Sequence, residues 1–451
     1  MRISIIVPVF NHERFLAECL MSLYDQSWGD LELVIIDDAS ADASFAVAES
    51  FAGLPWVRSR FSRIAIDRNA ANEGAARTIN AAIARSTGDL VMIANSDDRY
   101  SPRRAAACAE AIRGGCRFVF TSLRCIDESG RYTYSDEAAA FERTAAEIAR
   151  FPSVSLAMLG RNRAISTGNF CFTRELFETV GPFRPLRYCH DWDFVLAAVL
   201  EAEPCWIAEP LYEYRLHRTN SFRSLTAVGE AESRASVQRF FQAVDRRRDR
   251  NPTLRAMIEM PGLWRKLIRQ CGTTIEEEWL AISSGGAPRP IAALGGTTAP
   301  PAIRAGTAGT ESVIAGFQAR IAGELFLLGF SDEVYADGWT GEFASFRFRL
   351  GPGFDCVTAD LWTPPQREPC IAIFTVADGG KPPCETIATI QPGKINPVSF
   401  PVDDPAGGFS LAIRIPDAKA SDLDERRLGV VVAGVRAHRA TVSEAVAQAA
   451  G

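Results

Sequence analysis

The chain has 451 residues, so it is long enough for about three domains and a large buried core. Its 49 basic and 55 acidic residues leave a net charge of -6 and a pI near 5.5, which excludes the overall basic field that recruits nucleic acid. The 11 cysteines are scattered without any Cys-x-x-Cys pair, which argues against a disulfide framework or a structural zinc site and favours reduced, mostly buried thiols.

The N-terminus carries no signal-peptide pattern, because Met1 and Arg2 lead directly into the strand-like run 3–7. No apolar run approaches the roughly 18 residues that a membrane-spanning helix needs. We therefore expect an enzyme of the cytoplasm. The basic run 246–250 favours a solvated helix end over a binding patch, although it leaves peripheral contact with anionic lipid at the inner face of the plasma membrane open.

Short apolar runs alternate with amphipathic stretches over residues 3–125. This alternation predicts a series of βαβ units and therefore a mainly parallel sheet. The expected strands are 3–9, 31–36, 57–66, 90–94, 118–120 and 168–172, and the expected helices are 15–24, 43–52, 75–84, 102–112 and 175–180.

The composition of the chain changes twice in its second half. Residues 226–283 are periodic and helical, whereas residues 284–310 are rich in Gly, Ala, Pro and Thr and are typical of a flexible linker. Strand-like runs separated by turn residues then predict a β-sandwich. These runs are 325–328, 343–350, 356–362, 370–376, 385–390, 397–402, 409–415 and 428–435. The expected divisions are 1–222 (α/β domain), 223–283 (helical extension), 284–311 (linker), 312–440 (β-sandwich) and 441–451 (tail).

Polar and acidic residues follow the apolar run 90–94 directly, in the order Asn95, Ser96, Asp97 and Asp98. Open α/β sheets bind ligands outside the carboxyl ends of their strands. A diphosphate leaving group needs a divalent cation, and Mg²⁺ or Mn²⁺ takes one or two protein carboxylates in addition to phosphate oxygens. Asp97 and Asp98 therefore predict a metal site, with capping of the helix after Pro102 as the alternative.

Two neighbouring strands are expected to end in residues suited to nucleotide binding. Phe10 and Asn11 follow the first strand, and Asp37 and Asp38 follow the second, so all four should lie at the rim of one crevice. A carboxylate at this rim can accept hydrogen bonds from a base N–H or from ribose hydroxyls. For one of the two acids, capping of the helix near Ala43 is an equal alternative.

Asn72, Gly74 and Arg77 surround the start of the helix expected at 75–84. The N-terminus of a helix can face a phosphate, glycine allows the backbone to approach closely, and arginine offers a fixed fork of donors. Taken alone, an Asn-x-Gly sequence before a helix more often marks an ordinary turn.

A second acidic cluster, His190-Asp191-Trp192-Asp193, opens an apolar helical segment. The helix dipole stabilises a carboxylate at this position and keeps it ionised near neutrality. Asp191 can then accept a proton from an attacking hydroxyl, whereas helix capping accounts better for Asp193. His217 lies between two arginines and can meet a metal or a phosphate, although a lone histidine is usually structural.

Five of these motifs occur in the order seen in family 2 glycosyltransferases of the GT-A fold, which the chain resembles over about residues 1–222. The resemblance implies an α/β fold, a GT-A-type nucleotide-binding α/β/α sandwich. The helical extension and the separate all-β sandwich predicted above follow it in the chain. The resemblance further implies inverting transfer of a sugar from a nucleotide-diphosphate sugar to a hydroxyl acceptor, with divalent Mn or Mg, in surface polysaccharide or glycoconjugate synthesis. The motifs are Val7–Asn11, Ile36–Asp42, Asn72–Gly74, Asn95–Asp98 and His190–Phe194.

By the same resemblance, Asp38 reads the base, Asp97 holds the metal and Asp191 is the general base. The acceptor is a saccharide, a lipid-linked molecule or a protein. The residues implied for donor binding are Pro8, Phe10, Asn11, Asp38, Asn72, Gly74, Arg77, Asn95 and Ser96, those for the metal are Asp97, Asp98 and His217, and those on the acceptor side are His190 and Trp192.

The sequence departs from the family pattern at two positions. Asn95 replaces the first acid of the Asp-x-Asp element, and His190 replaces the glutamate that precedes the base. Because an amide can still bond to ribose, we expect changed donor contacts rather than lost activity. One alternative is a catalytically impaired protein that binds sugar nucleotides or acts as a scaffold. The other is a nucleotidyltransferase, which ranks last because the sequence has no glycine-rich basic loop near the first strand.

Segments 335–339 and 426–430 resemble, more weakly, a β-sandwich accessory domain of bacterial surface-polysaccharide enzymes. Trp339 and Trp362 could stack on sugar rings there, and burial in the sandwich is the commoner alternative for tryptophan.

Overall fold

The computed structural model divides the chain into two compact units. The first comprises Met1–Phe15, Cys19–Ser40 and Phe61–Arg304, and the second comprises Leu16–Glu18, Ala41–Arg60 and Ala305–Gly451. The structure describes residues 1–220, 226–271, 273–283, 321–322, 324–331, 334, 340–365, 367–378, 383–402, 408–416, 418–421, 424–428 and 430–439. The expected linker 284–311, the tail 441–451 and Trp339 lie outside these residues.

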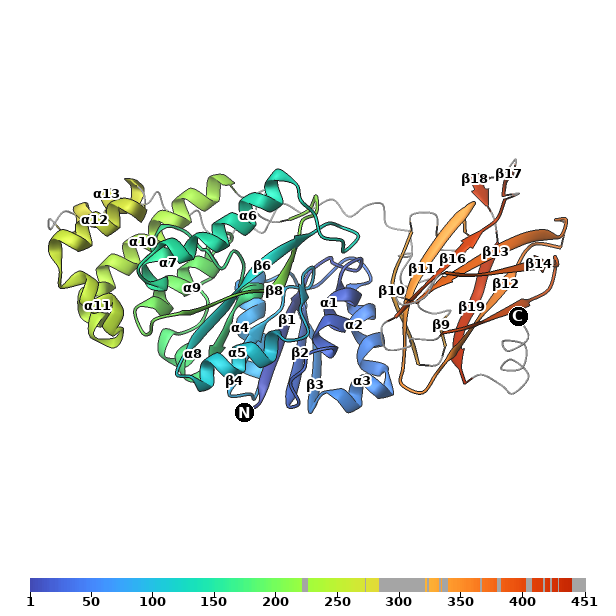
Figure 1. The fold of residues 1–451 in the computed structure, drawn as a ribbon, viewed down its shortest axis with the longest axis horizontal. Coiled ribbons are helices and arrows are strands. Elements are labelled where there is room, and N and C mark those ends of the chain that lie inside the picture. The colour runs from blue at the N-terminus through green and yellow to red at the C-terminus, as the bar shows by residue number, and fades with distance from the viewer. Residues whose placement is uncertain are drawn as a thin grey trace. The chain divides into compact units, whose positions relative to one another are not determined.

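The first unit is built on an eight-stranded mixed sheet in the order β3-β2-β1-β4-β7-β6-β8-β5 (Figure 1). Strands β1 to β4 run parallel, and β7 is antiparallel to both β4 and β6. Because β8 is parallel to β6, the carboxyl ends of β1, β2, β4 and β8 lie along the same edge of the sheet. The strands are β1 Ile3–Val9, β2 Leu31–Asp37, β3 Arg63–Arg68, β4 Leu90–Ile93, β5 Arg99–Tyr100, β6 Phe118–Ile126, β7 Cys171–Thr173 and β8 Cys205–Arg215.

Strands β2 and β4 are buried along their whole length, as strands covered on both faces require. Helix α4 buries Ala76, Ile79, Ala82 and Ile83, whose spacing of three and four residues places them on one face. The helices up to the last strand of the sheet are α1 Leu16–Tyr24, α2 Ser44–Gly53, α3 Pro55–Arg60, α4 Ala75–Arg85, α5 Arg104–Arg113, α6 Asp136–Ala146, α7 Val154–Gly160, α8 Arg174–Val180 and α9 His190–Val199.

The helical extension consists of α10 Thr226–Arg247, α11 Pro252–Ile258, α12 Pro261–Cys271 and α13 Thr273–Ser283. Its apolar residues do not form a core of their own. Phe240, Leu254 and Ile268 belong to the same buried cluster as Val91 of β4 and Phe172 of β7. The extension is therefore packed into the core of the α/β sheet.

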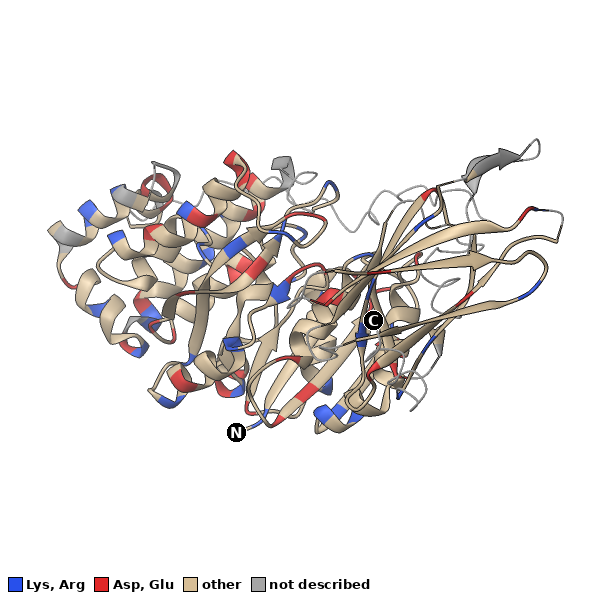
Figure 2. Ribbon diagram, turned by 45° about the vertical axis from the view of Figure 1, so that its right-hand side comes forward, with Lys and Arg blue, Asp and Glu red and all other residues tan. Residues whose placement is uncertain are grey.

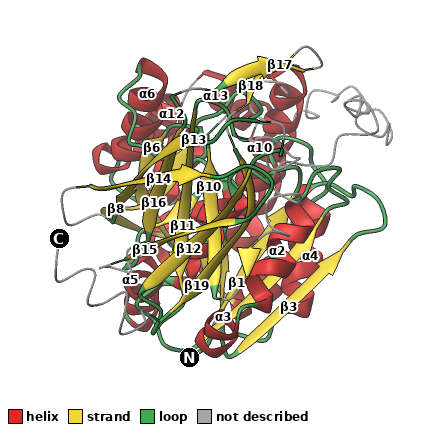
Figure 3. Ribbon diagram, turned by 90° about the vertical axis from the view of Figure 1, so that its right-hand side faces the viewer, coloured by secondary structure: helices red, strands yellow, loops and turns green. Residues whose placement is uncertain are grey.

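The described part of the second unit contains two large sheets, β10-β11-β16-β13-β14 and β15-β12-β19-β9, and a two-stranded sheet of β17 and β18 (Figure 3). The pairings are antiparallel except that of β9 with β19, and their inward side chains form one apolar cluster. The predicted separate β-sandwich is thereby confirmed. The strands are β9 Ile321–Ala322, β10 Leu325–Phe330, β11 Phe343–Leu350, β12 Cys356–Trp362, β13 Cys370–Ala377, β14 Cys384–Ile390, β15 Asn396–Pro401, β16 Phe409–Arg414, β17 Lys419–Ser421, β18 Asp424–Leu428 and β19 Val431–His438.

Two predictions about residues 1–222 are corrected by the structure. The run 57–66 was expected as one strand, but Pro55 begins helix α3 and the strand β3 starts only at Arg63, because proline is well suited to the first turn of a helix. The thiols were expected to be reduced, but Cys116 and Cys205 form a disulfide across 89 residues. Parallel pairing of β6 with β8 brings these two cysteines together, which spacing in the sequence could not reveal.

Acidic and basic residues are interspersed over the first unit, as their near balance in the sequence predicts (Figure 2). None of the described helices is both long enough and apolar enough to cross a membrane.

Candidate functional site at the carboxyl edge of the sheet

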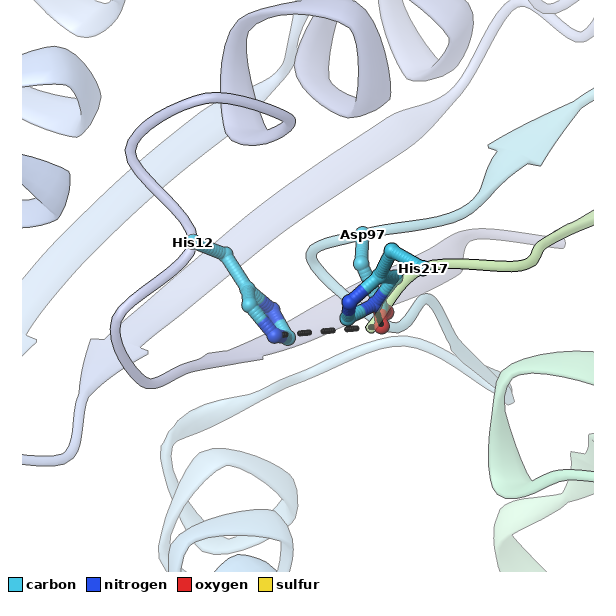
Figure 4. Close-up of side chains that lie close together, drawn as sticks. All are labelled: His12, Asp97 and His217. Carbon is cyan, nitrogen blue, oxygen red and sulfur yellow. Dashed lines mark hydrogen bonds and ion pairs between the residues drawn. The ribbon is translucent and has the colours of Figure 1, made fainter. Parts of the chain in front are cut away.

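Three side chains from loops far apart in the sequence meet at the carboxyl edge of the large sheet (Figure 4). His12 follows β1, Asp97 follows β4 and His217 follows β8. One ligand atom from each residue lies within 4.8 Å of the other two. The Nε2 atom of His217 is 2.9 Å from Oδ2 of Asp97, and Nε2 of His12 is 3.8 Å from the same oxygen. We refer to these three residues as the His-Asp-His cluster.

Neighbouring side chains hold both imidazole rings of this cluster. Nδ1 of His12 lies 2.7 Å from the hydroxyl of Ser96, and Nδ1 of His217 lies 2.9 Å from the hydroxyl of Thr219. In each ring the other nitrogen, Nε2, is thereby left facing Asp97. The ring of Phe15 packs 4.8 Å from that of His217, so the cluster is closed on one side by an apolar surface.

The electrostatics of the cluster favour an ionised Asp97. Burial raises the pKa of its carboxyl, but the electrostatic effects of His12 and His217 and the hydrogen bond from His217 outweigh this effect and lower the pKa to about 2. His217 is almost completely buried, whereas the side chain of His12 is 22% exposed, so the cluster is reached from the side of His12. A carboxylate and two imidazole nitrogens in this arrangement are a suitable donor set for a divalent cation.

Asp98 points away from this cluster. It accepts hydrogen bonds from the hydroxyl of Tyr212 and from the backbone N–H of Arg215, the latter over 2.8 Å. Burial and the charge of Asp97 raise the pKa of Asp98 well above its ordinary value. Arg215 in turn donates from Nε to the carbonyl of Asp97 over 2.7 Å. Asp98 therefore fixes the loop that presents Asp97.

Asp38 organises the loop that precedes α4. Its carboxylate accepts hydrogen bonds from the side chain of Asn69 at 2.7 Å and from the backbone N–H groups of Glu73 and Gly74 at 2.8 Å each. Gly74 has a φ of +87°, a conformation that glycine adopts without strain. Asp38 is only 3% exposed, and these bonds account for its burial. Of the other residues predicted there, Asn72 is partly exposed and Arg77 is exposed in the first turn of α4.

The turn after β1 is tied to the turn after β2. Asn11 has a φ of +54° and Ala39 a φ of +59°, and the backbone N–H of Asn11 donates to the hydroxyl of Ser40 over 2.9 Å. Phe10 is 37% exposed at this rim, and Pro8 is partly exposed within β1. The first two strands therefore end in one connected rim.

Asn95 bonds to the segment that precedes β7. Its Nδ2 donates to the hydroxyl of Ser166 over 2.6 Å, and its Oδ1 accepts from the hydroxyl of Thr167 over 3.1 Å. The side chain that replaces the first acid of the Asp-x-Asp element is thus engaged in holding residues 166 and 167.

Asp191 lies in the first turn of α9, as predicted, and is partly buried. Its Oδ2 accepts a hydrogen bond from Nδ2 of Asn162 over 2.7 Å, and its Oδ1 accepts from the backbone N–H of Trp192 over 2.7 Å. Burial raises the pKa of Asp191, and the electrostatic effect of His190 and these hydrogen bonds offset only part of the increase. A carboxylate with a raised pKa is a better proton acceptor than an ordinary aspartate.

The neighbours of Asp191 differ in their surroundings. Trp192 is buried in the core, where its indole N–H donates to the carbonyl of Met158 over 2.7 Å. Asp193 caps no helix end and instead pairs with Arg184 and Arg239. His190 is partly exposed at the start of α9.

Two residues of this site were not singled out by the sequence. His12 stands alone after Asn11, and only its position three residues beyond a strand end, on the edge where Asp97 was expected, could have drawn attention to it. Asn162 lies in an irregular segment between α7 and β7, and nothing in its sequence indicates that it reaches Asp191.

Residues 4–181 match the sequence model of a family described as "Glycosyl transferase family 2". A "Putative glycosyltransferase EpsE" of Bacillus subtilis is 34% identical over 23% of this chain and 35% of its own length. An uncharacterized glycosyltransferase of Nostoc sp. is 26% identical over 53% of this chain and 73% of its own length. The chain thus spans about a third of the first relative and about three quarters of the second.

Among solved structures, the chain is similar to S. aureus TarS in complex with UDP-GlcNAc. The identity is 16%, the TM-score is 0.42, and the match covers 63% of this chain and 93% of that one.

Proposed function

We propose that the chain transfers a sugar from a nucleotide-diphosphate sugar to a hydroxyl acceptor with inversion at the anomeric carbon. The match of residues 4–181 to the model of glycosyl transferase family 2 and the mixed α/β sheet support this proposal. The observation that carries this proposal is the position of Asp97, an ionised carboxylate at the carboxyl end of β4, with His217 beside it at 2.9 Å. We place the reaction in surface polysaccharide or glycoconjugate synthesis, with a saccharide, lipid-linked molecule or protein as acceptor. Peripheral association with the membrane is compatible with such an acceptor.

Asp97 and His217 would hold a divalent cation, Mn²⁺ or Mg²⁺. Their donor atoms fit such an ion, because an ionised carboxylate oxygen and an imidazole nitrogen face the same point. A bound cation stabilises the negative charge that develops on a departing nucleoside diphosphate. The protein side of this task is to hold the loop that presents Asp97, which Arg215 does through the hydrogen bond from its Nε to the carbonyl of Asp97.

Asp191 would accept the proton of the attacking hydroxyl. Asn162 and the backbone N–H of Trp192 hold one carboxylate oxygen each, so the orientation of the acid is set before an acceptor arrives. Proton acceptance in the transition state is worth a factor of roughly 10²–10⁴ in rate.

The donor would bind along the rim formed by the ends of β1 and β2 and the start of α4. The backbone around Gly74 is fixed by Asp38, and Arg77 is exposed in the first turn of α4, where the helix dipole favours a phosphate. Asp38 supports this proposal because it shapes the loop. We further propose that its carboxylate accepts a hydrogen bond from the base of the nucleotide.

Incubation of the purified chain with UDP-, GDP- and TDP-sugars in the presence of Mn²⁺ tests this function. Release of nucleoside diphosphate supports sugar transfer, with slow hydrolysis expected when no acceptor is present. Binding of a donor without turnover would instead support a scaffold protein, and release of pyrophosphate would support nucleotidyl transfer.

A further inference from the structure

We propose that His12 is a third protein ligand of the metal and that the completed His-Asp-His cluster selects first-row transition ions such as Mn²⁺ and Co²⁺ over Mg²⁺. This inference deepens the proposed function, since it concerns the metal on which that function rests. It assigns a role to a residue outside the two expected metal-binding motifs.

The position of His12 is that of a ligand. Its Nε2 atom lies 3.8 Å from Oδ2 of Asp97, and its ring meets that of His217 edge to face, with centroids 5.7 Å apart. The three candidate donor atoms fall within 4.8 Å of one another, so a single ion can contact all of them (Figure 4). His12 also forms the exposed side of the cluster, which leaves the remaining coordination positions open to phosphate oxygens and water.

The hydrogen bond to Ser96 supports the same role. Metal-binding histidines almost always use their second ring nitrogen to bond to a neighbouring group, which fixes the ring orientation. Nδ1 of His12 does so with Ser96 at 2.7 Å, as Nδ1 of His217 does with Thr219 at 2.9 Å. Both imidazoles are therefore oriented before any ion binds.

The donor set predicts the preference for the ion. Mg²⁺ prefers oxygen ligands and keeps several waters, whereas imidazole nitrogens suit later first-row ions, whose affinity rises from Mn²⁺ to Co²⁺. A cluster of one carboxylate and two imidazoles offers Mg²⁺ a single favourable ligand. Asp98, which could have supplied a second carboxylate, is engaged by Tyr212 and Arg215 instead.

Calorimetric titration of the nucleotide-free full chain with Mn²⁺, Co²⁺ and Mg²⁺ tests the preference. We expect Co²⁺ to bind most tightly and Mg²⁺ at least about tenfold more weakly than Mn²⁺. His12→Ala should weaken binding of Mn²⁺ and Co²⁺ at least about tenfold, because loss of even a group that only supports a metal ligand typically weakens metal binding by this factor. Binding of Mg²⁺ should remain nearly unchanged. His438→Gln is the matched control, because His438 lies in the sandwich beside Thr358 and should leave all three affinities unchanged.

Pulsed EPR of the Mn²⁺ complex provides a readout that is independent of activity. We expect coupling to two imidazole nitrogens in the wild-type chain and to one in His12→Ala, with the same thermal unfolding midpoint in both. A single coupled imidazole in the wild-type chain, or equal affinity of wild type and His12→Ala for Co²⁺, would overturn the inference while leaving Asp97-dependent sugar transfer intact. Loss of one nitrogen signal together with absence of turnover on any donor would support the inference and contradict the proposed function.

Discussion

Asn162 donates a hydrogen bond from Nδ2 to Oδ2 of Asp191 over 2.7 Å. In the same segment, four residues further on, the hydroxyl of Ser166 accepts a hydrogen bond from Nδ2 of Asn95 over 2.6 Å. Between these two contacts Ile165 has a φ of +72°, a strained conformation that a β-branched residue adopts only where its surroundings impose it. One strained segment thus connects the proposed base with the loop that carries the proposed metal ligand.

Replacing Asn162 with Ala should lower kcat by roughly tenfold or more, because a hydrogen bond to a charged group contributes about 1.5–3 kcal/mol. Donor affinity should change little, since the bond orients Asp191 rather than the nucleotide site. Steady-state kinetics with separate measurement of nucleoside diphosphate binding checks both. Arg161→Ala is the matched control from the exposed adjacent position and should behave as wild type. Equal kcat in Asn162→Ala and Arg161→Ala would show that Asp191 needs no such support.

Replacing Asp191 with Asn preserves its size but removes its capacity to accept a proton. We expect kcat to fall by roughly 10²–10⁴ while the affinity for nucleoside diphosphate is retained. Single-turnover rates and equilibrium binding on the same preparation separate the two effects. Comparable turnover in the variant would exclude Asp191 as the base.

Burial raises the pKa of Asp191 above its ordinary value of 3.8. A general base works only when deprotonated, so kcat/KM should decrease as the pH falls through this raised pKa and should be constant above it. We expect the acidic limb of the pH profile to lie above pH 3.8 and to be absent from the residual activity of Asp191→Asn. An identical limb in both proteins would assign it to another group.

Sequence reasoning was most successful for features that follow from topology. The expectation that Asp97 lies in a metal site depended on a strand ending at the edge of a sheet, whereas His217 was singled out only as a histidine between two arginines. The structure brings the two side chains within 2.9 Å. The apolar segment that follows Asp191 located this residue at the start of a helix, as the structure shows. Sequence reasoning could not show that adjacent acids diverge, since Asp98 turns to Tyr212 while Asp97 turns to His217.

The features that sequence reasoning missed depend on tertiary contacts between unremarkable residues. His12 acquires its place only when β1, β4 and β8 are assembled, and Asn162 meets Asp191 across 29 residues of chain. Cys116 and Cys205 are joined because β6 pairs with β8. In the chain β7 lies between these two strands, but in the sheet β6 and β8 are direct neighbours. No local pattern encodes these three relationships.

A shortened protein that ends at residue 283 should stay soluble and retain donor hydrolysis if the domain boundaries expected from the sequence hold. The helical extension is retained in it because α10 to α13 share the core of the large sheet. Any acceptor targeting by the sandwich should be lost, so turnover on the natural acceptor should fall while hydrolysis persists. Size-exclusion chromatography and thermal unfolding of this protein and of residues 312–440 check the boundaries. Aggregation of the shortened protein, or non-cooperative unfolding of residues 312–440, would contradict these boundaries. Either result would show that the sandwich and the α/β domain share a core.

The central claim is metal-dependent transfer at Asp97, and its most direct test follows nucleoside diphosphate release from UDP-, GDP- and TDP-sugars while Mn²⁺ is titrated. The wild-type chain is compared with Asp97→Ala, after thermal unfolding has shown that the two proteins have the same unfolding midpoint. We expect saturable dependence on Mn²⁺ with at least one donor in the wild-type chain and no dependence in the variant. Release that is the same in both proteins, or no release from any donor at any concentration of Mn²⁺, would contradict the account.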